Sequence, residues 1–444
     1  MSAIIIALTL TIGCKSASPT PSPMPPTRTS PPPTATPAPP THTLLPPTAT
    51  LRPTDTPLPT PTASKTRRAW IKTPGKSRNS LAFDLVQTAD GGYLILGVTD
   101  YQGHRPNRRG DVYLIKSDPA GQVAWEKTYG GDLYDAGHAI IQAQDGGWLI
   151  LGETESFGAG DADFLLIKID PNGQELWSRT FGGPDNDFAL EFQRTADGGI
   201  IMVGGREDME GGDSDVYVVK CDALGNETWS QVYGSAYSEA AYAIHQTANG
   251  DFFILANVSY TEDDEDYDLY LLKIDALGHE IWSRTWNEPG KRAGHAMSPT
   301  SEGDYVIVGS HNPTGDDVGS DFMLLKINAD GHVLWTRTFG DENASNYGRV
   351  ITETPDGGYI IAGSSAQELY FQGSDIPIVK TDQEGEVVWT RLFNPGGHDA
   401  ARAIVSSADG GYVVAGYSTD ASRHANGLDD FRFVLIKLFK EAVE

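Results

Sequence analysis

Cysteine is nearly absent from this sequence. Only two of its 444 residues are cysteines, so no disulfide framework can stabilise the fold. Cys221 occupies a position at which sister segments of the chain carry Ile169, Ile274 and Ile327. We therefore interpret it as a packing residue without a disulfide partner.

Basic residues are also scarce. The chain has 33 lysines and arginines against 60 aspartates and glutamates, which gives a formal net charge of -27. A chain this acidic repels nucleic acid and anionic lipid headgroups, so we exclude both as binding partners. Cations, neutral glycans and basic proteins remain compatible with the charge.

Recognisable catalytic motifs are missing as well. The ten histidines are scattered, and no His-Glu-x-x-His, Gly-x-Ser-x-Gly or phosphate-cradling glycine loop is present. We therefore expect a non-enzymatic binding or scaffolding protein. Two alternatives stay open: a secreted enzyme that acts on polysaccharide as a carboxylate-based hydrolase or lyase, because carboxylates abound, and a purely structural spacer.

The start of the chain has the features of a targeting segment. Residues 3–13 form an apolar run that is too short to span a bilayer but suits a signal peptide. The run ends in "LTIGC", which resembles the lipobox of bacterial lipoproteins, with Thr11 where that pattern prefers leucine. The resemblance implies that residues 1–14 are a signal peptide and that Cys14 is lipidated. The protein would then be extracytoplasmic, anchored at the cell surface and in contact with the membrane only through its lipid. An ordinary cleaved signal peptide is the alternative.

A segment rich in proline and threonine follows, over residues 15–65. Such a composition cannot bury a core, so we predict a disordered, extended stalk of polyproline character.

The rest of the chain repeats itself. An Asp-Gly-Gly turn, strict or degraded, recurs at Asp90, Asp145, Asp197, Asn249, Glu302, Asp356 and Asp409, with spacings of 52 to 55 residues. Each repeat contains four short apolar or alternating runs separated by glycine and aspartate turns, and none has a helical period. Four strands, A to D, repeated seven times predict an all-β fold, a seven-bladed β-propeller over residues 66–440.

The turn between strands C and D carries a regular signature that runs from a lysine through Asp or Asn and Gly to a tryptophan. Six complete copies occur, from Lys116–Trp125 to Lys380–Trp389, but Lys437 has no tryptophan after it. Trp70 precedes the first Asp-Gly-Gly turn by 20 residues, as Trp125 precedes the second. We therefore predict that the strand containing Trp70 completes the last blade and closes the ring.

These residues carry two resemblances. The Asp, Gly and Trp of the hairpin resemble the repeats of pyrroloquinoline-quinone-type propellers, although the Asp-to-Gly spacing is one residue shorter and Lys replaces the usual Ala. The pairing of "DGGY" with "W..TFGG" is similar to repeats of bacterial cell-envelope propellers. The likeness implies a fold and a location, and no catalytic residue or cofactor can be carried over from it.

Ligand-binding candidates lie where blades differ, on the face that bears the D-to-A and B-to-C connections. The residue seven positions before each Asp-Gly-Gly turn varies, while the residue before it is always Ala or Gly; the seven are Phe83, His138, Leu190, Tyr242, His295, Arg349 and Arg402. We predict that they form a ring at the mouth of a central channel and that a glycan or protein ligand contacts His138, Tyr242, His295, Arg349 and Arg402. Further candidates are Asp135, Asp187 and Asp399 on D-to-A loops and the aromatic pair Tyr370 and Phe371. We expect a monomer.

Three aspartate pairs precede strand C in consecutive blades: Asp161 and Asp163, Asp213 and Asp215, and Asp266 and Asp268. Calcium binds carboxylate oxygens of flexible loops, so these pairs are candidate calcium ligands. The second aspartate of each pair recurs alone in other blades, which favours a turn-capping role instead.

Overall fold

The structure is a computed structural model that describes residues 69–76, 79–101, 109–207, 213–260, 267–286, 290–313, 319–340, 344–367, 373–419 and 430–440. The signal peptide, Cys14 and the stalk lie outside the described residues, as do Tyr370, Phe371 and Asp266. Within the described ranges no helix is long and apolar enough to cross a membrane.

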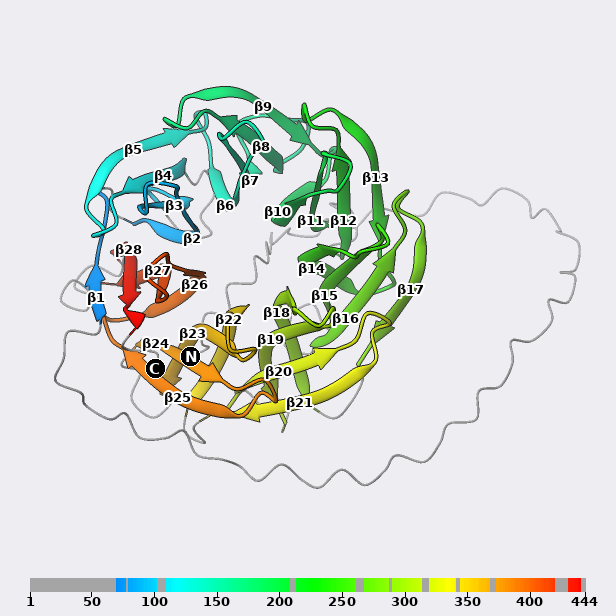
Figure 1. The fold of residues 1–444 in the computed structure, drawn as a ribbon. Coiled ribbons are helices and arrows are strands. Elements are labelled where there is room, and N and C mark those ends of the chain that lie inside the picture. The colour runs from blue at the N-terminus through cyan, green and yellow to red at the C-terminus, as the bar shows by residue number, and fades with distance from the viewer. Residues whose placement is uncertain are drawn as a thin grey trace, which may run out of the picture. The chain divides into compact units, whose positions relative to one another are not determined.

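The predicted all-β propeller is confirmed. Seven antiparallel sheets of four strands each surround a central axis (Figure 1). In the first six blades the strands follow chain order from the inside outward. Blade 1 consists of β2 (Leu81–Gln87), β3 (Tyr93–Val98), β4 (Val112–Ser117) and β5 (Val123–Tyr129), and blade 2 of β6 (Asp135–Gln142), β7 (Trp148–Thr154), β8 (Asp163–Ile169) and β9 (Glu175–Phe181). Blade 3 consists of β10 (Asn186–Arg194), β11 (Ile200–Glu207), β12 (Ser214–Cys221) and β13 (Glu227–Tyr233).

The remaining blades repeat the pattern. Blade 4 consists of β14 (Ser238–Gln246), β15 (Phe252–Ser259), β16 (Tyr267–Ile274) and β17 (Glu280–Thr285). Blade 5 consists of β18 (Lys291–Pro299), β19 (Tyr305–Asn312), β20 (Asp321–Ile327) and β21 (Val333–Phe339), and blade 6 of β22 (Ala344–Glu353), β23 (Tyr359–Gln367), β24 (Ser374–Thr381) and β25 (Val387–Phe393).

Blade 7 is built from both ends of the described chain, as predicted. Its inner strands are β26 (Asp399–Ser406), β27 (Tyr412–Thr419) and β28 (Phe431–Leu438), and its outer strand is β1 (Ala69–Lys72). Trp70 pairs with Lys437 across β1 and β28, the same cross-strand pairing that joins Lys116 to Trp125 in blade 1. The first described strand therefore closes the ring.

The repeated tryptophan docks one blade onto the next. A Cβ added to Gly121, in the C-to-D turn of blade 1, would lie 2.6 Å from the indole of Trp70, and Gly173 meets Trp125 in the same way at 2.8 Å. Gly121 also has a φ of +74°, a left-handed conformation that favours glycine. One glycine thus satisfies the turn and admits the indole, which explains why Gly and Trp recur together.

The Asp-Gly-Gly turn is held to strand C by the repeated lysine. The ammonium of Lys116 lies 2.8 Å from the carboxylate of Asp90, and the hydrogen bonds from Lys116 and Thr88 lower the pKa of Asp90 well below its usual range. Equivalent ion pairs occur in five other blades: Lys168–Asp145, Lys220–Asp197, Lys326–Glu302, Lys380–Asp356 and Lys437–Asp409. In blade 4, where Asn249 replaces the aspartate, Lys273 lies 3.8 Å from Asp251 instead.

The core lies between blades rather than at the centre of the ring. In one cluster, Leu149 and Phe164 of blade 2 pack against Met202 and Tyr217 of blade 3, and all four are buried. Cys221 belongs to this cluster and is free and buried, in agreement with its predicted packing role. Because neighbouring sheets supply the core, the centre of the ring is left to the innermost strands.

Candidate functional site

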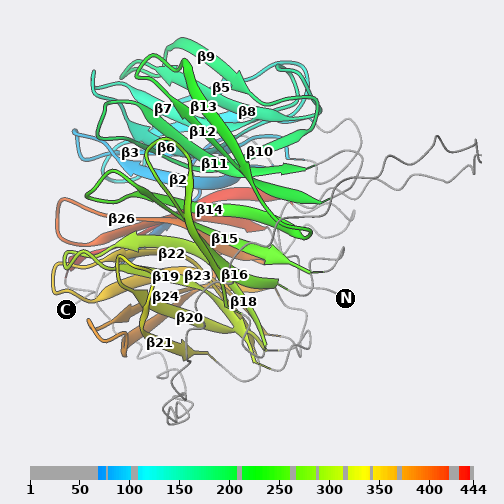
Figure 2. The same cartoon turned by 90° about the vertical axis from the view of Figure 1, so that its right-hand side faces the viewer.

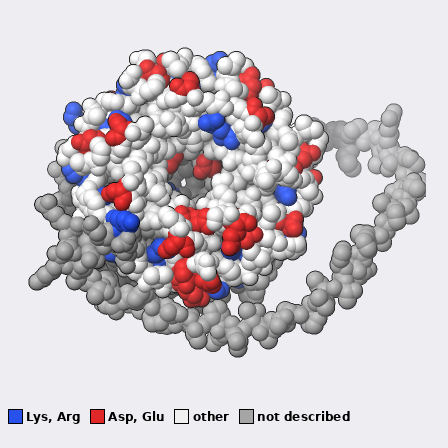
Figure 3. Space-filling model, in the orientation of Figure 1, with Lys and Arg blue, Asp and Glu red and all other residues white. Residues whose placement is uncertain are grey.

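The innermost strands β2, β6, β10, β14, β18, β22 and β26 surround the central axis (Figure 1). The space-filling view shows an opening at the centre of the ring (Figure 3). Seen from the side, the strands cross the thickness of the ring, so that the connections lie on two opposite faces (Figure 2). We call the face with the A-to-B and C-to-D turns the turn face, and the face with the D-to-A and B-to-C connections the loop face.

Every innermost strand contains a β-bulge at the position predicted to form the ring. The register of strand A against strand B skips one residue in each blade: Phe83, His138, Leu190, Tyr242, His295, Arg349 and Arg402. A bulge leaves its extra residue out of the ladder and re-aims the side chain. The predicted variable positions are therefore the seven bulged residues, and each lies at or near the middle of its strand.

In six of the seven blades a glycine of strand B faces the residue just before the bulge, and blade 4 has Ala256 there. Gly97 faces the chain just before the bulge of blade 1, where an added Cβ would lie 1.8 Å from the carbonyl oxygen of Leu81. The same close approach recurs at Gly152, Gly204, Gly309, Gly363 and Gly416. The bulges are therefore part of the repeated backbone, while the side chains they carry differ.

The bulged residues contact one another around the ring. The rings of Phe83 and His138 lie 5.1 Å apart, and those of Tyr242 and His295 lie 6.0 Å apart. The guanidinium of Arg402 lies 6.0 Å from the centre of the Phe83 ring, which joins blade 7 to blade 1. With the contact between Arg349 and His295, these contacts involve all five bulged residues that the sequence identified as ligand-binding candidates. We call the seven bulged residues the channel ring.

One side of the channel ring is cationic. Arg349 in β22 and Arg402 in β26 lie on neighbouring blades, and neither forms an ion pair with a carboxylate of the described residues. Arg402 lies against the rings of Phe83 and Tyr417. Burial, and then the positive charge of Arg402, lower the pKa of Arg349 to about 10. Arg349 nevertheless stays charged at neutral pH.

His295 adjoins this pair and is neutral. Burial, followed by the charges of Arg349 and Arg402, lowers its pKa well below the usual value. Its Nδ1 lies 3.4 Å from Nη1 of Arg349. A guanidinium can only donate, so Nδ1 accepts and the ring proton is on Nε2. Nε2 is buried and has no hydrogen-bond partner among the described residues, and neither does Nε of Arg402.

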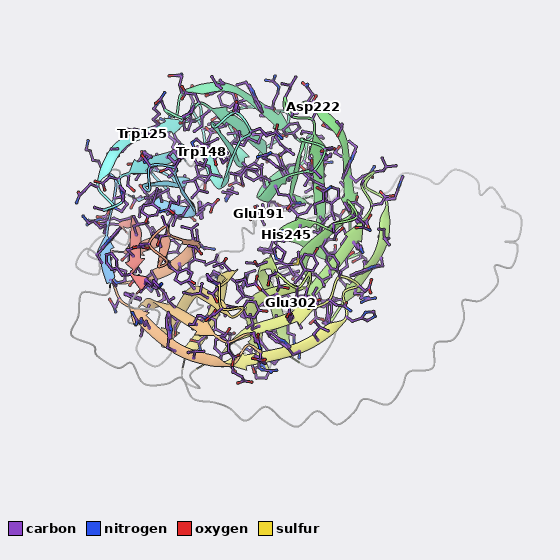
Figure 4. The ribbon with its side chains drawn as sticks, in the orientation of Figure 1. Trp125, Trp148, Glu191, Asp222, His245 and Glu302 are labelled. Atoms are coloured by element: carbon purple, nitrogen blue, oxygen red, sulfur yellow. The ribbon has the colours of Figure 1, made fainter. Side chains whose placement is uncertain are left out.

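Two carboxyl groups that the sequence did not single out complete the channel. Asp84 and Glu191 follow the bulges of blades 1 and 3, and Figure 4 labels Glu191 beside the central opening. Both residues are partly buried, and their carboxyl groups are close enough for the charge of one to affect the other. Burial raises the pKa of Asp84 to about 7, against hydrogen bonds donated by the amides of Ile140 and Leu85. Burial and the charge of Asp84 raise the pKa of Glu191 to about 8.

The three acids predicted on the D-to-A loops form hydrogen bonds or an ion pair within the protein. Asp135 accepts hydrogen bonds from the amide of Gly131 and from Thr154 and Ser156. Asp187 forms an ion pair with Arg206, with 2.6 Å between Oδ1 and Nε. Asp399 accepts from the amide of Gly396, and all three acids are buried. These bonds give the three acids a structural role near the turns, and their contact with a ligand stays a prediction.

The calcium candidates divide between exposed and capping positions. Asp161 and Asp213 are exposed, whereas Asp163 is buried, Asp268 is buried and Asp215 is partly buried. The carboxylate of Asp163 accepts hydrogen bonds from the amides of Ala159 and Gly160, which is the turn-capping geometry. Within the described part of the chain no group of three or more His, Cys, Asp or Glu residues could hold a metal ion.

A second concavity lies at the outer edge of the ring. A groove of about 870 Å³ runs between β1 with the residues after it and β5, and its lining includes Lys72, Trp125 and Glu126. Its polar groups are mostly backbone and exposed side chains at the turn, without the convergent buried donors of the channel. The channel ring is therefore the stronger site.

Comparison with known families gives one match, over two overlapping stretches. Residues 162–369 and 268–428 match the pyrroloquinoline-quinone-type propeller repeat family described as outer membrane protein assembly factor BamB. Together the two stretches cover more than half of the chain.

Individual relatives are more distant. Regulatory protein FlaEY of Caulobacter vibrioides is 25% identical over 156 residues, which cover 32% of this chain and 16% of that protein. A protein of unknown function from Dyadobacter fermentans aligns with a TM-score of 0.45 and 11% identity, covering 84% of this chain and 99% of its own. The GH93 α-L-arabinofuranosidase of Fusarium graminearum, in complex with arabinobiose, aligns with a TM-score of 0.44 and 10% identity, covering 67% and 91%. At these scores neither structure carries an argument.

Proposed function

The chain belongs to the pyrroloquinoline-quinone-type propeller repeat family described as outer membrane protein assembly factor BamB, and we propose that it is a non-enzymatic binding or scaffolding propeller of the cell envelope. In this proposal Cys14 anchors it at the cell surface, and the loop face with the channel ring receives a glycan or protein ligand. The envelope location is supported by the family and by the lipobox-like start of the chain.

One observation carries the proposal. Seven bulges present seven side chains to one channel from a backbone that is otherwise repeated blade by blade. The residues that dock the blades, such as the Trp70 indole on Gly121, are nearly the same in each repeat. The bulged residues include an aromatic ring, histidines, a tyrosine and two arginines. Side chains that vary at a concave site, on a scaffold that is otherwise constant, are typical of a ligand-binding site.

The ligand can be sought with a glycan array and a peptide array, both probed with the purified protein. The hits are then tested with His138→Ala, Tyr242→Ala and Arg349→Ala, and with Asn172→Ala on the turn face as the matched control. We expect each ring variant to weaken binding at least tenfold and the control to bind like the parent. A ligand whose affinity is unchanged in the ring variants but which no longer binds Asn172→Ala would place the binding surface on the turn face. Absence of any ligand would favour the structural spacer.

The carboxyl pair favours one further candidate, a hydrolase or lyase acting on polysaccharide. Asp84 and Glu191 lie in the channel with pKa values raised to about 7 and about 8, and the charge of Asp84 contributes to the shift of Glu191. A general acid needs a carboxyl group that keeps its proton near neutral pH. Release of reducing ends from a polysaccharide panel tests this, and both Asp84→Asn and Glu191→Gln should abolish it. Unchanged activity in both variants would exclude the pair.

A further inference from the structure

The cationic side of the channel ring has donors without acceptors. Arg349 and Arg402 lie side by side and have no carboxylate partner among the described residues. Nε of Arg402 and Nε2 of His295 are buried without a hydrogen-bond partner. Buried polar groups are nearly always paired in folded proteins, and two adjacent guanidinium groups repel each other unless an anion lies between them. An anionic ligand would satisfy both requirements.

We propose that the channel binds a sugar that bears a carboxylate, such as a terminal uronic acid residue, with the carboxylate held by Arg349, Arg402 and the Nε2 proton of His295. The proposal deepens the binding function above and rests on it. A planar guanidinium matches a carboxylate through two parallel hydrogen bonds, which makes arginine the preferred partner of this group. His295 adds a neutral donor because its other ring nitrogen already accepts from Arg349.

Two carboxyl groups suit the rest of such a sugar. Glu191 belongs to blade 3, across the opening from blades 6 and 7, which carry the arginines, whereas Asp84 belongs to blade 1, next to blade 7 (Figure 1). Carboxyl groups accept and, when protonated, also donate hydrogen bonds, so they can pair with hydroxyl groups. Burial keeps both partly protonated near neutral pH. A uronic acid offers a carboxylate to the arginines and hydroxyl groups to the two carboxyl groups.

Aromatic rings provide apolar surface beside the cations. Phe83 and Tyr417 flank Arg402, and the ring of Tyr242 meets that of His295 edge-on. Aromatic faces and a few polar groups are the usual lining of a small-molecule site. A peptide end would also offer a carboxylate, and its amides could donate to Asp84 and Glu191. A sugar hydroxyl can both donate to and accept from a partly protonated carboxyl group, which favours the sugar.

The charge of the whole molecule limits the ligand. A formal net charge of -27 repels polyanions at long range. The channel ring contains two arginines, Arg349 and Arg402, to offset that charge. We therefore expect a ligand with one carboxylate at the binding end of a neutral chain, rather than a densely charged polymer.

The test is calorimetric titration of the full-length protein with glucuronate and galacturonate. Glucose and galactose are the neutral controls, and a short peptide with a free C-terminal carboxylate is the competing ligand. We expect the uronates to bind at least tenfold more tightly than the neutral sugars, with an affinity that decreases as salt increases. Arg349→Gln and Arg402→Gln should each weaken uronate binding at least tenfold. Arg402→Lys, which keeps the charge but loses the planar fork, should also weaken it.

Arg179→Gln is the matched control, since Arg179 packs on Trp177 at the outer edge of blade 2 and its loss changes the net charge equally. Circular dichroism checks that each variant is folded. Uronates that bind no better than neutral sugars, or that bind both arginine variants like the parent, would overturn the inference. If only the peptide binds, through Arg349 and Arg402, the inference that the ligand is a sugar is refuted, but the proposed function stands. If no ligand on either array depends on the channel ring, the proposed function itself fails.

Discussion

Replacing Trp70 with alanine should destabilise the whole ring, although Trp70 lies only two residues from the start of the described chain. Its indole covers Gly121 of blade 1 and packs against the cluster between blades 7 and 1, which includes Tyr113 and Phe433. Trp70 is partly buried, as are all six sister tryptophans. Loss of the indole would remove the contact that joins the two ends of the ring.

The magnitude follows from the buried area. A buried aromatic side chain removes about 150–250 Å² from water. For a partly buried indole about two thirds of that, roughly 130 Å², is a fair measure, and at about 25 cal/mol per Å² the loss is about 3 kcal/mol. Trp177→Ala should cost a similar amount, because Trp177 packs on Gly225 in the same way. Ile71→Ala should cost less than about 1 kcal/mol, because the Ile71 side chain is 42% exposed.

Urea unfolding followed by circular dichroism measures these differences, provided that the slope of the transition is unchanged. Trp70→Ala should unfold at a lower urea concentration than Ile71→Ala, and close to Trp177→Ala. If Trp70→Ala and Ile71→Ala have the same midpoint, β1 does not close the ring in solution and the seven-bladed closure is refuted.

Three further predictions concern the anchor, the metal and the channel. Full-length protein should partition with membranes and incorporate labelled fatty acid, whereas Cys14→Ser should stay in the aqueous fraction; equal partitioning would exclude lipidation. Because Asp163 caps a turn, millimolar calcium should raise the melting temperature by less than about one degree, and a shift of several degrees would instead establish calcium binding. The folded-state pKa of Asp84 is raised above its unfolded value, so ionisation costs stability as pH rises from about 4 through about 7. Asp84→Asn should therefore gain stability relative to the parent as pH rises from about 4 to about 7 in urea unfolding, with a level difference above that range. A difference that stays constant from about pH 4 to about pH 7 would contradict the raised pKa.

The architecture could be predicted because the same sequence pattern recurs in seven repeats. Spacing alone located Trp70 as the missing seventh tryptophan and Lys437 as its partner. It also located the bulged positions, because a variable residue followed a small one at a constant distance from each turn. The bulge itself was not predicted, since it is a shift in the pairing of strands A and B, which the spacing along one strand does not reveal.

The acids were harder to assign, because carboxylates are abundant and sequence does not reveal which are buried. Asp135, Asp187 and Asp399 were predicted as ligand contacts. Each accepts a hydrogen bond from a turn amide, and ligand contact stays a prediction. Asp84 and Glu191 were missed, although a signal was present. The other five blades have small or apolar residues at that position: Ala139, Ala243, Ala296, Val350 and Ala403. A carboxyl group at a position that is otherwise small or apolar sets blades 1 and 3 apart from the rest.

Closure by β1 also means that the first and the last described strands to be synthesised must pair with each other. β1 is the first described strand to leave the ribosome, and its partner β28 is the last, about 360 residues later. At roughly 5–20 residues per second, β1 waits about 20 to 70 s for its partner to be synthesised. Throughout that interval Trp70 has no seventh blade to join, and the unpaired edge of β1 resembles the strand edges through which proteins aggregate. The nascent chain must therefore remain protected until its final strand has been made.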